Sequence, residues 1–139
     1  MTGNLVFLDS AYAIALASRA DEHHAKALQL SRHVASHRVR LLTTRAVCFE
    51  IGNALAKLRF RAISVQFLDG LESSSTTDIV PLTEDLHRQA FDLYRQRPDK
   101  EWSLTDCLSF VVMSQRGLNE ALTSDEHFEQ VGFKALLRQ

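Results

Sequence analysis

The chain has 139 residues, 45% of them hydrophobic, which is enough for one compact domain and too few for two ordinary ones. Its formal charge of −1 gives no general attraction to nucleic acids or other polyanions. The longest uncharged apolar stretch, LSFVVM near residue 110, is much shorter than the roughly 20 residues that cross a bilayer. The sequence therefore predicts a single domain over residues 1–139 and excludes a membrane-spanning protein.

The N-terminal segment and the cysteines indicate the compartment. The segment MTGNLVFLDS has no basic residues before its apolar run, so it is not typical of a signal peptide. Cys48 and Cys107 are the only cysteines and form no CxxC pair, which favours free thiols over a disulfide or a zinc site. We therefore expect a cytoplasmic protein.

Five short apolar runs are typical of strands buried on both faces of a parallel sheet. In chain order they are NLVFLD (4–9), VRLLTT (39–44), DIVPL (78–82), EALTS (120–124) and FKALL (133–137). Segments of helical length and pattern lie between them, at 11–19, 22–37, 45–60, 63–71, 83–97, 103–117 and 125–131. Strands that alternate with helices predict an α/β fold with a mainly parallel sheet.

Helix boundaries and core positions follow from individual residues. Leu58 continues the apolar spacing of the 45–60 helix, and Gly70 is predicted to end the next one. Thr83 is predicted to cap the 83–97 helix, and Gly117 to stop the strongly apolar 103–117 helix. Four phenylalanines in apolar patterns are interpreted as core residues: Phe49, Phe110, Phe128 and Phe133.

Four acidic residues stand where a parallel α/β sheet places its chemistry, outside the carboxyl ends of the strands. Asp9 ends the first predicted strand and Asp125 directly follows the fourth. Glu50 lies beside the apolar stripe of its helix, and Asp106 lies in the first turn of the most hydrophobic helix. A buried carboxylate without a partner costs several kcal/mol, and no lysine or arginine is an obvious partner for all four. A shared divalent cation would satisfy them together.

Each acid also has a purely structural explanation. Asp106 could close a capping box that begins at Ser103, and Asp125 could cap the short helix that follows it. Asp9 could cap the helix that begins at Ala11, and Glu50 could be a solvated helix residue. Four independent coincidences are less economical than one site. Mg²⁺ and Mn²⁺ prefer oxygen ligands and activate water beside a phosphate, so phosphodiester hydrolysis is the reaction class that this pattern favours.

These segments resemble the PIN-domain family, in particular its VapC-like ribonuclease toxins. The resemblance spans nearly the whole chain and rests on LVFLDS, TTRAVCFEIGNAL, WSLTDCLSF and ALTSDEHF. The last two at this separation are rather specific, whereas a strand that ends in Asp-Ser is a weak signal alone. The resemblance implies a three-layer α/β/α fold with a five-stranded sheet, a Mg²⁺ or Mn²⁺ site and endonucleolytic cleavage of RNA. It also implies a homodimer and, for the toxins, a cognate antitoxin protein.

The family's acids carry over residue by residue onto Asp9, Glu50, Asp106 and Asp125, as metal ligands and catalytic residues. Hydroxyl side chains around them are expected to orient ligands or waters: Ser10, Ser103, Thr105 and Ser124. A surface position is favoured for His127, although it could approach the phosphate, and its role stays open together with that of Asp99. The number of metal ions and the identity of the RNA also stay open.

Two basic clusters are candidates for RNA contact, although a solvated helix face would explain them equally well. Their members are Lys57, Arg59, Arg61, Arg95, Arg97 and Lys100. If cations neutralised the four acids, the formal charge of −1 would become +3.

Other functions fit the sequence less well. An aspartyl phosphatase would need a second acid where Ala11 stands, and no GxGxxG or P-loop string occurs. His33 and His37 are one helical turn apart but lack a third zinc ligand of matching spacing. The main rival is a PIN-like module that binds RNA or a protein without cutting, and the presence of all four acids favours catalysis over it.

Overall fold

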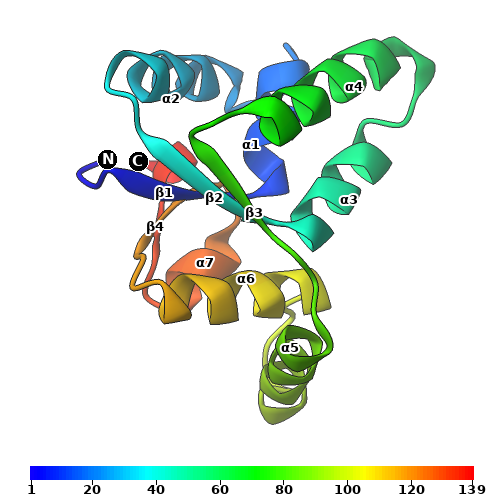
Figure 1. Ribbon diagram of the computed structural model, residues 1–139, viewed down its shortest axis with the longest axis vertical. Coiled ribbons are helices and arrows are strands. Elements are labelled where there is room, and N and C mark those ends of the chain that lie inside the picture. Colours follow the sequence, from blue (N-terminus) through cyan, green and yellow to red (C-terminus); the bar gives the residue numbers. More distant parts are fainter.

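A computed structural model describes residues 1–139 and shows five strands and seven α-helices (Figure 1). The strands are β1 (Leu5–Leu8), β2 (Arg40–Thr44), β3 (Thr77–Val80), β4 (Glu120–Leu122) and β5 (Lys134–Ala135). The helices are α1 (Ser10–Ala17), α2 (His24–Ser36), α3 (Arg45–Ala54), α4 (Leu58–Ser73), α5 (Glu84–Gln96), α6 (Leu104–Gln115) and α7 (Glu126–Gln130), and a 3₁₀ turn covers Leu136–Arg138. None of the helices is both long and apolar enough to span a membrane.

All strand pairs are parallel, and the order across the sheet is β3-β2-β1-β4-β5. Helices α1 to α4 lie on one side of the sheet, and α5, α6 and α7 lie on the other (Figure 1). This arrangement confirms the three-layer fold with a five-stranded parallel sheet. Because both faces are covered, the central strand β1 is apolar at every position, and Val6, Phe7 and Leu8 are fully buried.

Several local predictions are confirmed. Thr83 caps α5 by accepting a hydrogen bond from the Leu86 N–H at 3.1 Å. Gly117 ends α6 with a φ of +67°, and the Leu118 N–H returns to the Met113 carbonyl at 2.9 Å. Both cysteines are buried and free. Phe110 packs edge-on against Phe128, with ring centroids 5.0 Å apart, and both rings are in the core.

The segment between residues 45 and 73 departs from the prediction. The helix expected over 45–60 ends at Ala54, and a second helix then runs from Leu58 through Gly70 to Ser73. Leu55 is buried just after the end of α3, so the backbone turns there, and Leu58 becomes 95% exposed. Arg61 stabilises the turn because its guanidinium donates two hydrogen bonds to the Ala56 carbonyl, at 3.1 and 2.7 Å.

Phe49 was also predicted wrongly, since its side chain is 68% exposed. The buried face of α3 carries Val47, Cys48 and Ile51, and Phe49 projects from the opposite side. Strands β4 and β5 are shorter than expected at their carboxyl ends, because Thr123 and Asp125 begin the connection to α7 and Leu136 enters the 3₁₀ turn.

Candidate active site

The four acidic residues approach one another at the carboxyl ends of β1 and β4. These two strands are neighbours, but the chain leaves β1 toward β2 and returns later on its other side, which is the switch point where parallel α/β sheets bind ligands. Asp9 follows β1 and Asp125 follows β4, while Glu50 comes from α3 and Asp106 from α6. We call Asp9, Glu50, Asp106 and Asp125 the acidic cluster.

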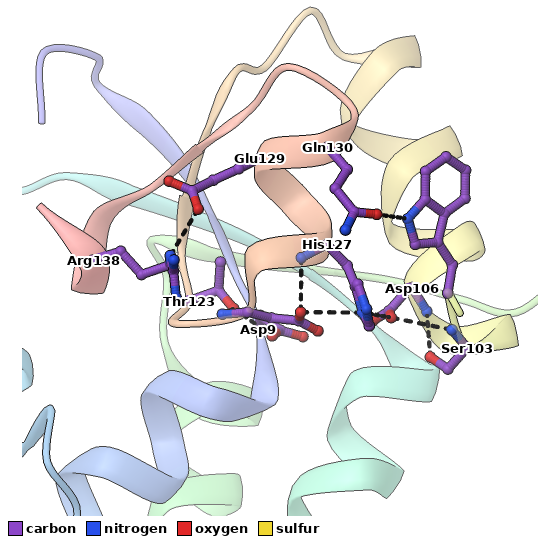
Figure 2. A network of polar contacts seen from close by, with 10 residues as sticks. Asp9, Ser103, Asp106, Thr123, His127, Glu129, Gln130 and Arg138 are labelled. Atoms are coloured by element: carbon purple, nitrogen blue, oxygen red, sulfur yellow. Dashed lines mark hydrogen bonds and ion pairs between the residues drawn. The ribbon is translucent and has the colours of Figure 1, made fainter. Parts of the chain in front are cut away.

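Asp9 is the most deeply placed member, with 3% of its surface exposed. Its Oδ2 accepts a hydrogen bond of 2.7 Å from Thr123 Oγ1 (Figure 2). Burial raises the pKa of Asp9 to about 7, and the charges of Glu50 and Asp106 add to this rise, while the bond from Thr123 opposes it. Asp9 stands at the N-cap position of α1, but its side chain makes no cap hydrogen bond. The capping explanation is therefore wrong for this residue.

Glu50 lies on the site-facing side of α3, where its Oε1 accepts a hydrogen bond from Ser10 Oγ. The residue is partly buried and forms no ion pair with a lysine or arginine. Ser10 directly follows Asp9, so this bond ties the start of α1 to α3 beside the acidic cluster. Glu50 is therefore not a freely solvated helix residue.

Asp106 closes the capping box of α6. Its Oδ2 accepts from the Ser103 N–H at 3.1 Å, and its own N–H donates to Ser103 Oγ at 3.0 Å (Figure 2). The cap therefore exists, as one of the two explanations expected. The pKa of Asp106 is nevertheless raised, first by burial and then by the charges of Asp125 and Glu50, which outweigh the lowering by the cap and by His127.

Asp125 caps α7 by accepting a hydrogen bond of 2.9 Å from the His127 N–H. Its own N–H donates to Thr123 Oγ1 at 3.0 Å. The Thr123 hydroxyl thus contacts both Asp9 and the backbone of Asp125, and its side chain is fully buried. No sequence signal separated this threonine from the other hydroxyl residues near the acids.

No lysine or arginine forms an ion pair with any member of the acidic cluster. Glu120, a buried acid at the other end of β4, shows the contrast. It accepts hydrogen bonds from the Thr2 and Gly3 N–H groups at 3.0 and 3.1 Å, and it lies 3.7 Å from the N-terminal ammonium group of Met1. At one end of β4 the buried carboxylate thus has hydrogen-bond donors and a positive charge beside it. At the other end, the four carboxylates of the acidic cluster have no lysine or arginine partner.

The donor set fits a divalent cation. Single ligand atoms of Asp106, Asp125 and His127 lie within 4.8 Å of one another. His127 Nδ1 is buried and has no hydrogen-bond partner, although it lies 3.1 Å from Asp125 Oδ1. An unpartnered nitrogen among carboxylates is what a metal site without its ion would contain. Asp9 and Glu50 lie outside this group of three but near it, since the charge of Glu50 raises the pKa of both Asp9 and Asp106.

Comparison with known proteins agrees with this geometry. The family model described as PIN domain matches residues 6–134. The chain belongs to the PIN-domain family. Its curated relatives include the 23S rRNA-specific endonuclease VapC20 of two Mycobacterium tuberculosis strains, each 26% identical over 129 residues that cover 93% of this chain and 95% of the relative.

A solved structure shows the same fold. It is the crystal structure of Mycobacterium tuberculosis VapC20, described as a toxin that cleaves the sarcin-ricin loop. The two chains superpose with a TM-score of 0.83 at 25% identity, over 94% of this chain and 97% of the other. The VapC-like resemblance seen in the sequence is therefore confirmed.

The remaining predicted site residues of this PIN domain lie around the acidic cluster. Ser10 and Ser103 bond to acids, as described above, and Thr105 borders a hollow that Glu50 and Asn53 also line. Ser124 stands between Thr123 and Asp125, and its hydroxyl makes no hydrogen bond within the chain. Ser124 was thus predicted as a site residue, and Thr123, whose hydroxyl donates to Asp9, was missed.

The basic residues fall into two places. Lys57, Arg59 and Arg61 lie at the turn between α3 and α4 and in the first turn of α4. Arg95, Arg97 and Lys100 border a hollow of about 570 Å³ between the end of α5 and Ser103, which contacts the acidic cluster through Asp106. Asp99, whose role was open, forms two hydrogen bonds of 3.0 Å with the Arg97 guanidinium.

Proposed function

We propose that this PIN domain is a Mg²⁺- or Mn²⁺-dependent endoribonuclease and the toxin of a toxin-antitoxin pair. The observation that carries the proposal is the convergence of four carboxylates, without a lysine or arginine partner, at the switch point of the sheet. Asp9, Glu50, Asp106 and Asp125 would hold the metal. A divalent cation held there would lower the pKa of a water molecule and stabilise charge on the phosphate.

Hydroxyl side chains hold the members of the acidic cluster in position. Thr123 holds Asp9 and the backbone before α7 in fixed positions, and Ser10 holds Glu50, so the acids are oriented before any ligand binds. Ser103, Thr105 and Ser124 complete the ring of hydroxyl groups. RNA would approach over the basic residues, with Arg95, Arg97 and Lys100 bordering the hollow nearest Asp106.

The substrate and partners are proposed from the relatives. VapC20 is named for cleavage of 23S rRNA, and its structure for the sarcin-ricin loop. An rRNA hairpin loop is therefore the first substrate to test. We also propose that residues 1–139 form one domain, that the protein acts in the cytoplasm as a homodimer, and that it binds an antitoxin. Size measurement of the native complex would test the last two points.

The decisive experiment compares cleavage of an rRNA hairpin by the purified protein in Mn²⁺, in Mg²⁺ and in chelator. We expect cleavage at internal bonds with either ion and none in chelator. The matched control is Glu120→Gln, which removes a carboxylate outside the acidic cluster and should leave the metal dependence unchanged. RNA binding without cleavage in any metal would instead identify a PIN-like binding module and overturn the enzymatic proposal.

A further inference from the structure

His127 is placed by its own helix against two members of the acidic cluster. Its Nδ1 lies 3.1 Å from Asp125 Oδ1 and 3.5 Å from Asp106 Oδ2, and Figure 2 shows the ring facing Asp106. The side chain is 24% exposed, but Nδ1 itself is buried. The ring is thus half-buried, contrary to the surface position that the sequence favoured.

Two contacts hold the helix that carries this ring. The Asp125 carboxylate accepts a hydrogen bond from the backbone N–H of His127, so residues 125 and 127 lie in the same turn of α7. The next residue, Phe128, is fully buried between Phe7 and Phe110, with centroids 6.3 and 5.0 Å away. The core therefore holds α7 so that Nδ1 points toward the acids.

The separations of these atoms match those of ligands on one ion. In octahedral coordination with bonds of about 2.1 Å, neighbouring ligand atoms stand about 3 Å apart. Nδ1 lies at 3.1 and 3.5 Å from the two carboxylate oxygens, and it makes no hydrogen bond with either. If the His127 ring bonded directly to a carboxylate, an Nδ1–H would point at one of these two oxygens. The ring is not oriented in that way.

We propose that His127 Nδ1 is a nitrogen ligand to the ion held by Asp106 and Asp125, and that it makes the site prefer Mn²⁺ over Mg²⁺. The proposal rests on the metal site of the proposed function. Both ions favour carboxylate oxygens, but Mn²⁺ is a first-row transition ion that accepts an imidazole nitrogen more readily than Mg²⁺, which takes oxygen ligands almost exclusively. A site with oxygen ligands alone would lack this source of preference.

The competing arrangement is a protonated His127 that pairs with the two acids and competes with the cation. The two cases predict opposite changes in metal affinity when His127 is replaced. Removal of a ligand weakens Mn²⁺ binding, whereas removal of a competing positive charge strengthens the binding of both ions.

The test measures metal binding and nitrogen coordination in the full chain, with no substrate. Calorimetry gives Mn²⁺ and Mg²⁺ affinities for the wild type, His127→Gln and the control His87→Gln, an exposed histidine on α5. Pulsed electron paramagnetic resonance of bound Mn²⁺ detects a ligated nitrogen. We expect His127→Gln to lose at least tenfold in Mn²⁺ affinity and less than threefold in Mg²⁺ affinity. The nitrogen coupling should be present in the wild type and the control only.

The outcomes separate the two proposals. If the wild type binds neither ion, the proposed metal-dependent function fails. If the wild type binds Mn²⁺ without a nitrogen coupling, or if His127→Gln binds both ions equally well or more tightly, the His127 proposal alone is overturned. Thermal melting in chelator checks folding of each variant. His127→Asn, whose side-chain oxygen can stand near the position of Nδ1, provides a second variant that should bind Mn²⁺ but show no coupling.

Discussion

At the scale of the residue, Asp106 combines a structural role with a site position. Oδ2 is the atom that accepts the Ser103 N–H and also the one that lies 3.5 Å from His127 Nδ1. A carboxylate has lone pairs left after one hydrogen bond, so it can cap α6 and still bind a cation. The sequence presented these roles as alternatives, but the geometry makes them compatible. A variant that keeps the cap and removes the charge therefore tests the site by itself.

Asp106→Asn should abolish RNA cleavage and leave the metal-free protein equally or more stable. Asparagine keeps an oxygen for the Ser103 N–H, and it removes one charge from a cluster whose members raise the pKa values of Asp9 and Asp106. Denaturant midpoints in chelator and cleavage rates in Mn²⁺ provide the two measurements.

Thr83→Ala is the control for the loss of a helix cap. It removes the hydroxyl that caps α5 by accepting the Leu86 N–H, outside the acidic cluster, and should cost about 1 kcal/mol of stability with cleavage retained. An Asp106→Asn protein that cuts RNA normally and melts lower would show that Asp106 is only a helix cap.

Thr123→Val is expected to weaken metal affinity and cleavage by about 10- to 100-fold, the range for residues that orient metal ligands. Valine keeps the shape but removes the hydroxyl that contacts Asp9 and the Asp125 N–H. The partly buried Asp125 N–H left without its partner should also cost about 1 kcal/mol of stability.

Two variants separate these effects. Thr43→Val removes a buried hydroxyl that donates to the Leu8 carbonyl at 2.8 Å, so it should reduce stability without changing metal affinity. Thr123→Ser should restore both properties. Normal metal binding by Thr123→Val would rule out the orienting role.

At the scale of the element, residues that follow a single periodic pattern were predictable and residues set by tertiary packing were not. The cap at Thr83 and the stop at Gly117 are local, so the sequence was sufficient for them. The break after α3 depends on Leu55 entering the core, and a repeat of apolar residues cannot distinguish this from one continuous helix.

The same distinction applies to the candidate site. Three of the acids stand out in the sequence because they follow a strand or lie in the first turn of a helix, and Glu50 stands out because it lies beside the apolar stripe of its helix. The role of Thr123 depends on its contact with Asp9, 114 residues away, so its neighbour Ser124 was predicted instead. The direction of the His127 ring depends on the phase of a five-residue helix, so a surface position was favoured for it. Phe49 shows the limit of core prediction, since its apolar neighbours in the sequence did not show that it lies on the exposed face of α3.

The hollow beside α5 leads to a prediction about RNA binding. The Arg97 guanidinium lies 5.1 Å from the centre of the Trp102 ring, and the hollow also exposes Tyr94 and Lys100. Replacing Arg97 and Lys100 with alanine should raise KM for RNA about tenfold with little change in kcat. The dependence of log affinity on log salt should fall by about 0.7 for each phosphate of a single strand that the protein no longer neutralises.

Arg32→Ala on α2 is the control, because this exposed arginine lies in the other helical layer. Its salt dependence should equal that of the wild type. If the double variant also keeps the wild-type slope, RNA does not cross this hollow, and the basic residues at the turn between α3 and α4 become the alternative route.

At the scale of the whole molecule, the acidic cluster makes stability depend on pH and on metal. The pKa of Asp9 is about 7 in the folded protein against an ordinary value of 3.8, so the folded state holds this proton more tightly than the unfolded chain. Metal-free stability should therefore fall as pH rises from about 4 to about 7, by an amount on the order of a few kcal/mol.

Metal should reverse this trend, because it binds the deprotonated acids. An ion at a hundred times its dissociation constant adds about 2.7 kcal/mol, or a rise in Tm on the order of 10 °C for a chain of this size. Melting curves at pH 5 and pH 8 with and without Mn²⁺ should show a large shift only at pH 8. No shift at millimolar Mn²⁺ would count against the site.

The strand order also determines when the site can form during translation. Strand β4 pairs with β1 through Phe7 and Ala121, so the ribosome must synthesise most of the chain before β1 gains its second neighbour. Until then the nascent sheet exposes β1 as an edge, and Asp9 lacks both Thr123 and Asp125. Each polypeptide would thus be harmless to RNA while it is being made and would become a nuclease only when its last strands dock.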